Sequence, residues 1–225
     1  MTTRNLRVWD LPTRLFHWSL ALCVVGLVVT AKVGGNAMAW HLWLGLLMLT
    51  LLAFRLVWGV VGGSWSRFAH FTRGPSAVLN YLRGRSPAAH LVGHSPLAGW
   101  AVCAMLTILT AQTITGLMSD DEIAFFGPLV SKVSGDTVAL ATWWHGEWGQ
   151  YLVLGFVVAH LVAIAYYSWV RHQGIVRPMF SGDQSVPADV AVGPARDDVG
   201  LRMRAAIVLA TCAVGTWALV SWATP

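Results

Sequence analysis

Five long apolar segments constrain what this chain can fold into more than any other feature. An α-helix needs about 20 mainly apolar residues to cross roughly 30 Å of hydrocarbon, and each segment is close to that length or longer. Of the 225 residues, 56% are hydrophobic and 11% are charged, a composition that argues against a soluble domain. A transmembrane barrel would show short alternating segments instead. We therefore predict an all-α membrane protein with spans at residues 16–33, 40–61, 97–118, 144–170 and 205–223.

The spans fall into a core and a separate fifth helix. Residues 1–173 contain the first four spans and are expected to form a four-helix transmembrane bundle. Residues 174–203 are rich in Gly, Pro, Ser, Asp and Val without helical periodicity, which is typical of a linker, here cytoplasmic. Residues 204–225 form the fifth helix. The first span follows basic residues as a signal peptide does, but its apolar stretch is long for one, so we expect a retained helix.

The placement of Lys and Arg predicts the orientation of the spans. With the N-terminus in the cytoplasm, the inner segments hold most of the arginines and the outer segments carry only Lys32 and Lys132. Five spans then leave the C-terminus outside. The net charge of +5 is therefore a signal of topology and does not indicate a nucleic-acid partner. Most of the 13 tryptophans fall near span ends, where their rings favour the headgroup level of the membrane lipid.

Four histidines within or beside the spans carry the expected chemistry, because ionisable residues at such positions are costly and are functional candidates by default. His41 and His145 are expected at the outer level and are called the outer pair; His17 and His160 are expected at the inner level and are called the inner pair. His145 and His160 are 15 residues apart, hence about 22 Å along a helix and within about 60° of one face. Two imidazoles approaching from opposite sides provide the axial ligands of a b-type haem. The alternative is that each histidine only forms an interhelical hydrogen bond.

Arg55 is a further candidate within a span. It follows His41 by 14 residues, which places it about 21 Å deeper and within about 40° of the same helix face. Its guanidinium would lie near the inner haem and pair with a propionate. The alternative is that the side chain extends to the inner headgroups of the lipid.

At this point the sequence resembles a known family. The core, roughly residues 6–173, is similar to the bacterial dihaem cytochrome b561 family, and more narrowly to the cytochrome b subunits of membrane-bound nickel-iron hydrogenases. The order and spacing of several short stretches make the resemblance specific. These stretches are WDLPTRLFHW, WHLWLG, FRLVWGVVG, SRFAHFTRGP, GHSPLAGW, QTITGLM and WHGEWGQYLVLGFVVAH.

The resemblance implies that the inner and outer pairs ligate two haems b, and that the chain transfers electrons across the bacterial inner membrane in exchange with quinone. The expected partners are lipid, quinone and a periplasmic or membrane redox protein; a homodimer is left open. The family places its last two histidines one residue closer together than the 15 residues found between His145 and His160. A local π-bulge would absorb the extra residue.

Two questions stay open at the level of sequence. A stand-alone quinone-coupled oxidoreductase competes with a membrane subunit that passes electrons for a separate catalytic protein, and the hydrogenase-like stretches favour the subunit. A protein of another class, which binds or transports a metal through the same histidines, is the alternative. Transport sites generally lie near the membrane midplane, whereas these histidines are expected at two separate levels.

Overall fold

The computed structural model describes residues 2–223, and the chain divides into two compact units. The first unit comprises residues 1–16, 56–104 and 159–206, and the second comprises residues 17–55, 105–158 and 207–225. Within residues 2–223, five helices are long and apolar enough to cross a membrane, which confirms the predicted all-α membrane fold. These spans cover Leu11–Val33, Ala37–Val61, Ala88–Leu117, Gly135–Val170 and Val199–Ala223.

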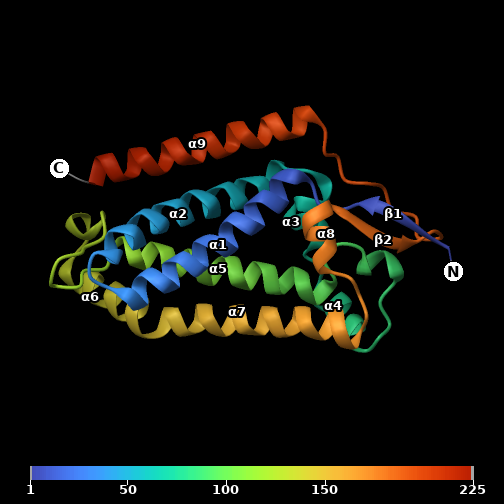
Figure 1. The fold of residues 1–225 in the computed structure, drawn as a ribbon, viewed down its shortest axis with the longest axis horizontal. Helices are drawn as coiled ribbons and strands as arrows, with labels where there is room; N and C mark the ends of the chain where they lie inside the picture. Colours follow the sequence, from blue (N-terminus) through green and yellow to red (C-terminus); the bar gives the residue numbers. More distant parts are fainter. Residues whose placement is uncertain (1, 224–225) are drawn as a thin grey trace. The chain divides into compact units, whose positions relative to one another are not determined.

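Figure 1 labels the elements along the chain. The longest helices are α1 (Leu11–Val33), α2 (Ala37–Val61), α5 (Pro96–Leu117), α7 (Gln150–Ala165) and α9 (Val199–Ala223). Shorter helices are α3 (Phe68–Phe71), α4 (Pro75–Leu82), α6 (Gly135–Trp143) and α8 (Val176–Ser181). The strands are β1 (Thr3–Arg7) and β2 (Asp183–Pro187), with single 3₁₀ turns at Ser64–Ser66, Ala88–Leu91 and Val130–Lys132.

In the first unit, the segment predicted to be a linker contains regular structure that its composition does not predict. Strand β2 pairs antiparallel with β1, so that Arg7 lies opposite Asp183. Helix α8 ends at Gly182, whose φ of 89° is the left-handed conformation that glycine adopts without a steric cost. A six-residue helix shows no periodicity, and a strand whose partner lies at the other end of the chain has no local signal. The expected linker therefore contributes one strand of a small sheet to this unit.

Helix α1 begins five residues before the predicted span because Asp10 caps it. The Asp10 side chain is buried, and its carboxylate accepts the backbone N–H of Thr13 at 2.8 Å. The same carboxylate accepts the hydroxyl of Ser66 at 2.6 Å, and the Thr13 hydroxyl lies 2.7 Å from that of Ser66. A buried carboxylate that receives these donors joins the start of α1 to the turn after α2.

Asp197 connects the N-terminal strand to the start of α9. Its side chain is 7% exposed and forms ion pairs with Arg7 at 2.8 Å and Arg202 at 3.0 Å. It also accepts the backbone N–H of Leu11 at 3.1 Å. Burial by itself raises the pKa of Asp197, but the hydrogen bonds from Arg202, Leu11 and Arg7 outweigh that effect and hold the pKa below its ordinary value.

In the second unit, α1 and α2 form an antiparallel hairpin whose turn contains Gly34 and Gly35, both with positive φ. The Cys23 thiol lies 3.2 Å from the Leu44 carbonyl, across the two helices. Helix α9 contacts α2 in this unit through buried hydroxyls, since the Thr50 side chain donates to that of Thr216 at 3.0 Å.

The helix that carries the last two histidines starts earlier than predicted and contains a π-helical turn. It begins with α6 at Gly135, where the Ser134 side chain accepts the N–H of Thr137. A π turn, Trp144–Gly149, then leads into α7. A π turn holds one more residue than an α turn, so the π-bulge predicted from the 15-residue spacing is confirmed. A second π turn covers Tyr166–Val170.

Candidate haem sites

His41 is held by the neighbouring helix α1 through one ring nitrogen. Its Nδ1 lies 3.0 Å from the carbonyl of Leu27 and 3.2 Å from the hydroxyl of Thr30. A carbonyl only accepts, so this nitrogen carries the proton and donates to Leu27. The Thr30 hydroxyl itself donates to the Gly26 carbonyl at 2.7 Å, which leaves its oxygen available as an acceptor for His41. The other ring nitrogen, Nε2, is then deprotonated and able to ligate a metal.

His145 is held in the same way by α5. It lies in the π turn, and its Nδ1 donates to the backbone carbonyl of Gln112 at 2.8 Å. The ring packs directly against Gly116, where an added Cβ would lie 2.6 Å from the His145 Cε1 atom. Only a glycine at that position leaves room for the imidazole. As in His41, the bonded Nδ1 leaves Nε2 as the free ligating atom.

The two outer imidazoles are brought together within the second unit. Their ring centres are 6.1 Å apart and their planes are inclined by 82°. A metal–imidazole bond is about 2 Å long and the bonded nitrogen lies about 1 Å from the ring centre, so two imidazoles that share one ion have centres about 6 Å apart. Gly45 follows His41 by one helical turn, and apart from its chain neighbours and the nearby backbone of its own helix, no atom of the described residues lies within 4 Å of a Cβ added there. The donor set and the spacing of this pair therefore fit two imidazoles that would share one metal ion such as a haem iron.

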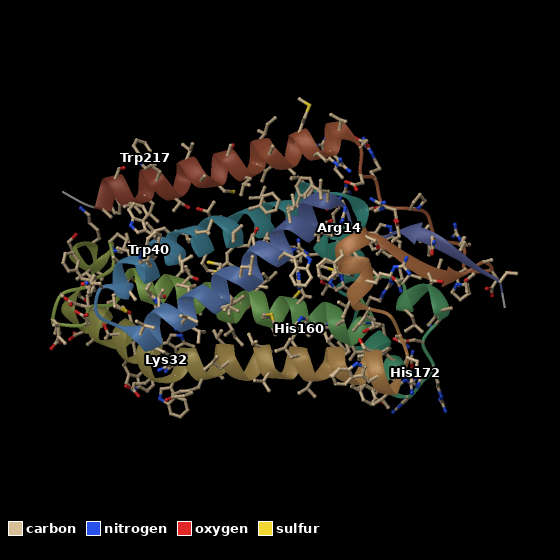
Figure 2. All side chains as sticks on the ribbon, viewed as in Figure 1. Arg14, Lys32, Trp40, His160, His172 and Trp217 are labelled. Atoms are coloured by element: carbon tan, nitrogen blue, oxygen red, sulfur yellow. The ribbon has the colours of Figure 1, made fainter. Side chains whose placement is uncertain are left out.

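The inner histidines occupy the predicted helices. His17 lies on α1, where its ring meets that of Trp18 edge-on at 5.1 Å. His160 lies on α7, and Figure 2 labels it there. His17 belongs to the second unit and His160 to the first, and their pairing stays a prediction.

Arg55 lies inside the protein. It is 3% exposed, on the last part of α2 that belongs to the second unit. A side chain this deeply buried does not extend to the surface where lipid headgroups would lie. This burial supports an internal role over the alternative of an interfacial arginine.

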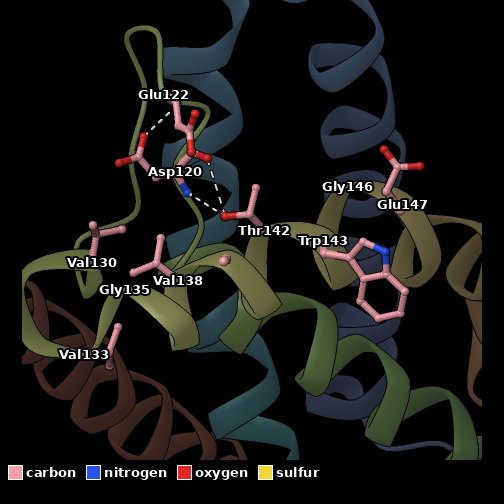
Figure 3. A pocket seen from close by; sticks show the side chains of 11 residues that line it. Asp120, Glu122, Val130, Val133, Gly135, Val138, Thr142, Trp143, Gly146 and Glu147 are labelled. Carbon is pink, nitrogen blue, oxygen red and sulfur yellow. Dashed lines mark hydrogen bonds between the residues drawn. The ribbon is translucent and has the colours of Figure 1, made fainter.

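In the second unit, a hollow of about 740 Å³ is lined by both acidic and apolar side chains, and its lining includes Gly146 and Glu147, which follow His145 in the sequence. Figure 3 shows Asp120 and Glu122 on one side of it and Glu147, which follows His145 by two residues, on the other. The Thr142 hydroxyl lies between these groups and accepts the backbone N–H of Asp120 at 3.1 Å. Carboxylates at the mouth of a site favour a basic partner and are able to accept protons.

Tryptophan side chains are exposed near the helix ends of the second unit. Trp40 and Trp217 are 68% and 70% exposed, and Figure 2 labels them on α2 and α9. These indole rings are therefore free to contact lipid, and their position at the level of the headgroups stays a prediction.

Sequence reasoning missed the residues that hold the outer pair in place. Thr30, Gln112 and Gly116 have no chemistry of their own that marks them as part of a metal site. The only available signal was the stretch QTITGLM, in which Gln112 and Gly116 are separated by four residues and therefore share one helix face.

Comparison with known proteins finds a family that matches most of the chain and several similar proteins. A family described as prokaryotic cytochrome b561 matches residues 8–182. The chain is similar to a probable Ni/Fe-hydrogenase B-type cytochrome subunit of Bradyrhizobium diazoefficiens, with 24% identity over 79% of this chain and 85% of that protein.

Two further relatives have the same description. The probable Ni/Fe-hydrogenase 1 B-type cytochrome subunit of Escherichia coli is 24% identical over 79% of this chain and 90% of its own length. The corresponding probable subunit of Cupriavidus necator is 25% identical over 78% of this chain and 85% of its own length. No solved structure matches the chain.

Proposed function

The chain belongs to the prokaryotic cytochrome b561 family, and we propose that it is a dihaem cytochrome b that exchanges electrons between quinone and a redox partner. It is a multi-pass membrane protein, and its family and relatives support electron transfer through haem b in the membrane. Haem b supplies a one-electron carrier. The helices hold its ligands, exclude water and fix the charges around it.

The observation that carries the proposal is the geometry of the outer pair. His41 and His145 would hold one iron through their Nε2 atoms, because a backbone carbonyl already receives the Nδ1 proton of each ring. Such hydrogen bonds fix the tautomer and make the imidazole a stronger donor to the metal. The 6.1 Å separation of the ring centres supports this assignment.

His17 and His160 would hold the second iron at the inner level. This part of the proposal rests on the family pattern and on the placement of both residues on long helices. Arg55 would pair with a propionate there, which its burial supports, since a buried guanidinium requires an anion or several acceptors around it.

The outer side offers groups suited to quinol oxidation or to a docked partner. Glu147 follows His145 by two residues and lines the acidic hollow, so its carboxylate would be placed to accept a proton from a substrate bound there. We place the protein in a bacterial inner membrane with its N-terminus in the cytoplasm and its C-terminus in the periplasm, on the basis of the arginine distribution. A homodimer is compatible with this arrangement.

The resemblance to hydrogenase cytochrome subunits favours a membrane subunit that passes electrons for a periplasmic or membrane redox protein over a stand-alone oxidoreductase. A metal transporter is a weaker candidate. A closed metal site needs about four ligands, and among residues 2–223 no group of three or more His, Cys, Asp or Glu side chains is placed to hold an ion.

The direct test is a dithionite-reduced minus oxidised spectrum of the purified protein, with haem quantified as the pyridine haemochrome. Two low-spin haems b per chain are expected, and a quinol added under anaerobic conditions should reduce at least one of them. A preparation without haem that retains zinc would overturn the proposal in favour of the metal-binding alternative.

A further inference from the structure

Gln112 makes two contacts with His145, and the two act on different parts of that residue. The backbone carbonyl of Gln112 receives the ring proton at 2.8 Å, and the Gln112 side-chain amide donates from Nε2 to the backbone carbonyl of His145 at 2.9 Å. One residue of α5 therefore holds both the imidazole and the main chain that carries it.

The second contact falls at the irregular point of the helix. In a regular α-helix the carbonyl of residue 145 would accept the N–H of residue 149, and a π turn shifts that bond by one residue. A side chain from another helix also donates to the carbonyl of His145, and such an insertion is a recognised cause of local distortion in a helical hydrogen-bond ladder.

Gly149 makes this approach sterically possible. A Cβ added at Gly149 would lie 1.9 Å from Oε1 of Gln112 and 2.8 Å from Nε1 of Trp144. No side chain fits in that space while Gln112 stays where it is. Gly149 is also the last residue of the π turn, so the Gln112 amide packs against the end of that turn.

We propose that Gln112 is a positioning residue for the outer haem ligand His145. Gly149 leaves the space that the Gln112 side-chain amide occupies. The proposal rests on the assignment of His145 as a ligand. The side-chain amide of Gln112 fixes the π turn and with it the direction of the His145 imidazole. The backbone carbonyl of Gln112 keeps the ring in the tautomer that leaves Nε2 free. A tight Nδ1–H bond increases the basicity of the imidazole and so stabilises the oxidised iron. Loosening that bond should raise the midpoint potential of the outer haem.

The test uses the full-length protein with Gln112→Met, which keeps the length of the side chain but removes its donor. Both haems should be retained, the midpoint potential of one haem should rise, and that of the other should not change. The ferric low-spin EPR signal of the same haem should also move, because this signal depends on the angle between the two imidazole planes, 82° here. Thr113→Val is the matched control, since the Thr113 hydroxyl bonds to Leu109 of its own helix.

Gly149→Ala provides an independent variant, because its methyl group would displace the Gln112 amide without altering Gln112 itself. It should reproduce the change in potential and in EPR signal, and the double variant should add little to either single one. A Gln112→Met protein with unchanged potentials and an unchanged EPR spectrum would overturn the positioning role. Absence of haem from the wild-type protein would instead contradict the proposed function, so the two failures are distinguishable.

Discussion

The rings of His41 and His145 are 6.1 Å apart at an angle of 82°, and each donates its Nδ1 proton to a backbone carbonyl of an adjacent helix. The two acceptors, on Leu27 and Gln112, belong to α1 and α5. Four helical segments of the second unit thus define the position of the outer pair. Main-chain acceptors cannot be removed by a side-chain substitution, so this geometry is better tested through the space around the two rings or by replacing the histidines.

Gly116→Ala should weaken or abolish haem binding at the outer site. The new methyl group would lie 2.6 Å from Cε1 of His145 and would displace the ring from its present position. Overpacking of this kind costs about 1–3 kcal/mol. The haem-to-protein ratio should fall from two toward one.

Gly215→Ala is the control for that variant. Gly215 lies in α9, and apart from its chain neighbours and the nearby backbone of α9, no atom of the described residues is within 4 Å of a Cβ added there. The control should retain the full haem content. Equal haem content in both variants would contradict the close packing of Gly116 against a ligand.

Arg55→Gln should lower the midpoint potential of the inner haem and leave that of the outer haem nearly unchanged. A buried guanidinium near an iron disfavours the ferric state, which carries one more positive charge, so removing it favours oxidation. A redox titration followed at the haem absorption bands measures both potentials. Arg83→Gln, in an exposed position after α4, serves as the control. If Arg55→Gln shifts neither potential, Arg55 does not interact with a haem.

Ser66→Ala should destabilise the part of the first unit where α1 begins. The substitution removes the hydroxyl that donates to the buried Asp10 carboxylate at 2.6 Å. Hydrogen bonds to charged groups contribute about 1.5–3 kcal/mol, so the thermal unfolding midpoint in detergent should drop clearly. Ser64→Ala, two residues earlier and exposed, should leave the midpoint unchanged. The same midpoint in both variants would show that the carboxylate does not depend on this donor.

Acid should loosen the connection between β1 and α9 through Asp197. Ion pairing holds the pKa of this carboxyl below its unfolded value, so its contribution to stability is complete above that value and is lost as the pH falls through the folded pKa. The unfolding temperature of the wild type should therefore decrease below about pH 4. Asp197→Asn should be less stable at neutral pH and should show a shallower decrease.

Asp189→Asn, which changes an exposed carboxyl of the same segment, is expected to follow the wild-type curve. If the Asp197→Asn protein shows the wild-type pH dependence, the acid sensitivity arises from other groups.

Much of this architecture follows from the sequence because its signals are local. Hydropathy predicts all five spans, and the position of each histidine within a span follows from counting residues along a helix. The π turn is also predictable, because the extra residue between His145 and His160 has to be accommodated somewhere.

Other features depend on contacts between distant residues and leave no local signal. Asp10 extends α1 beyond its apolar stretch by capping it. Strand β2 exists because β1 lies beside it, although Thr3 and its partner Pro187 are at opposite ends of the sequence. Gln112 resembles any polar residue within a span until the carbonyl of His145 is seen to accept its amide.

The most direct test of the central claim, that His41 and His145 share one iron, is the haem content of three variants. His41→Ala, His145→Ala and the double variant should each retain one haem b per chain, with the same redox potential in all three. His172→Ala, in the exposed segment after α7, should retain two. A double variant without haem, while each single variant keeps one, would show that the two histidines ligate different irons and would contradict the account.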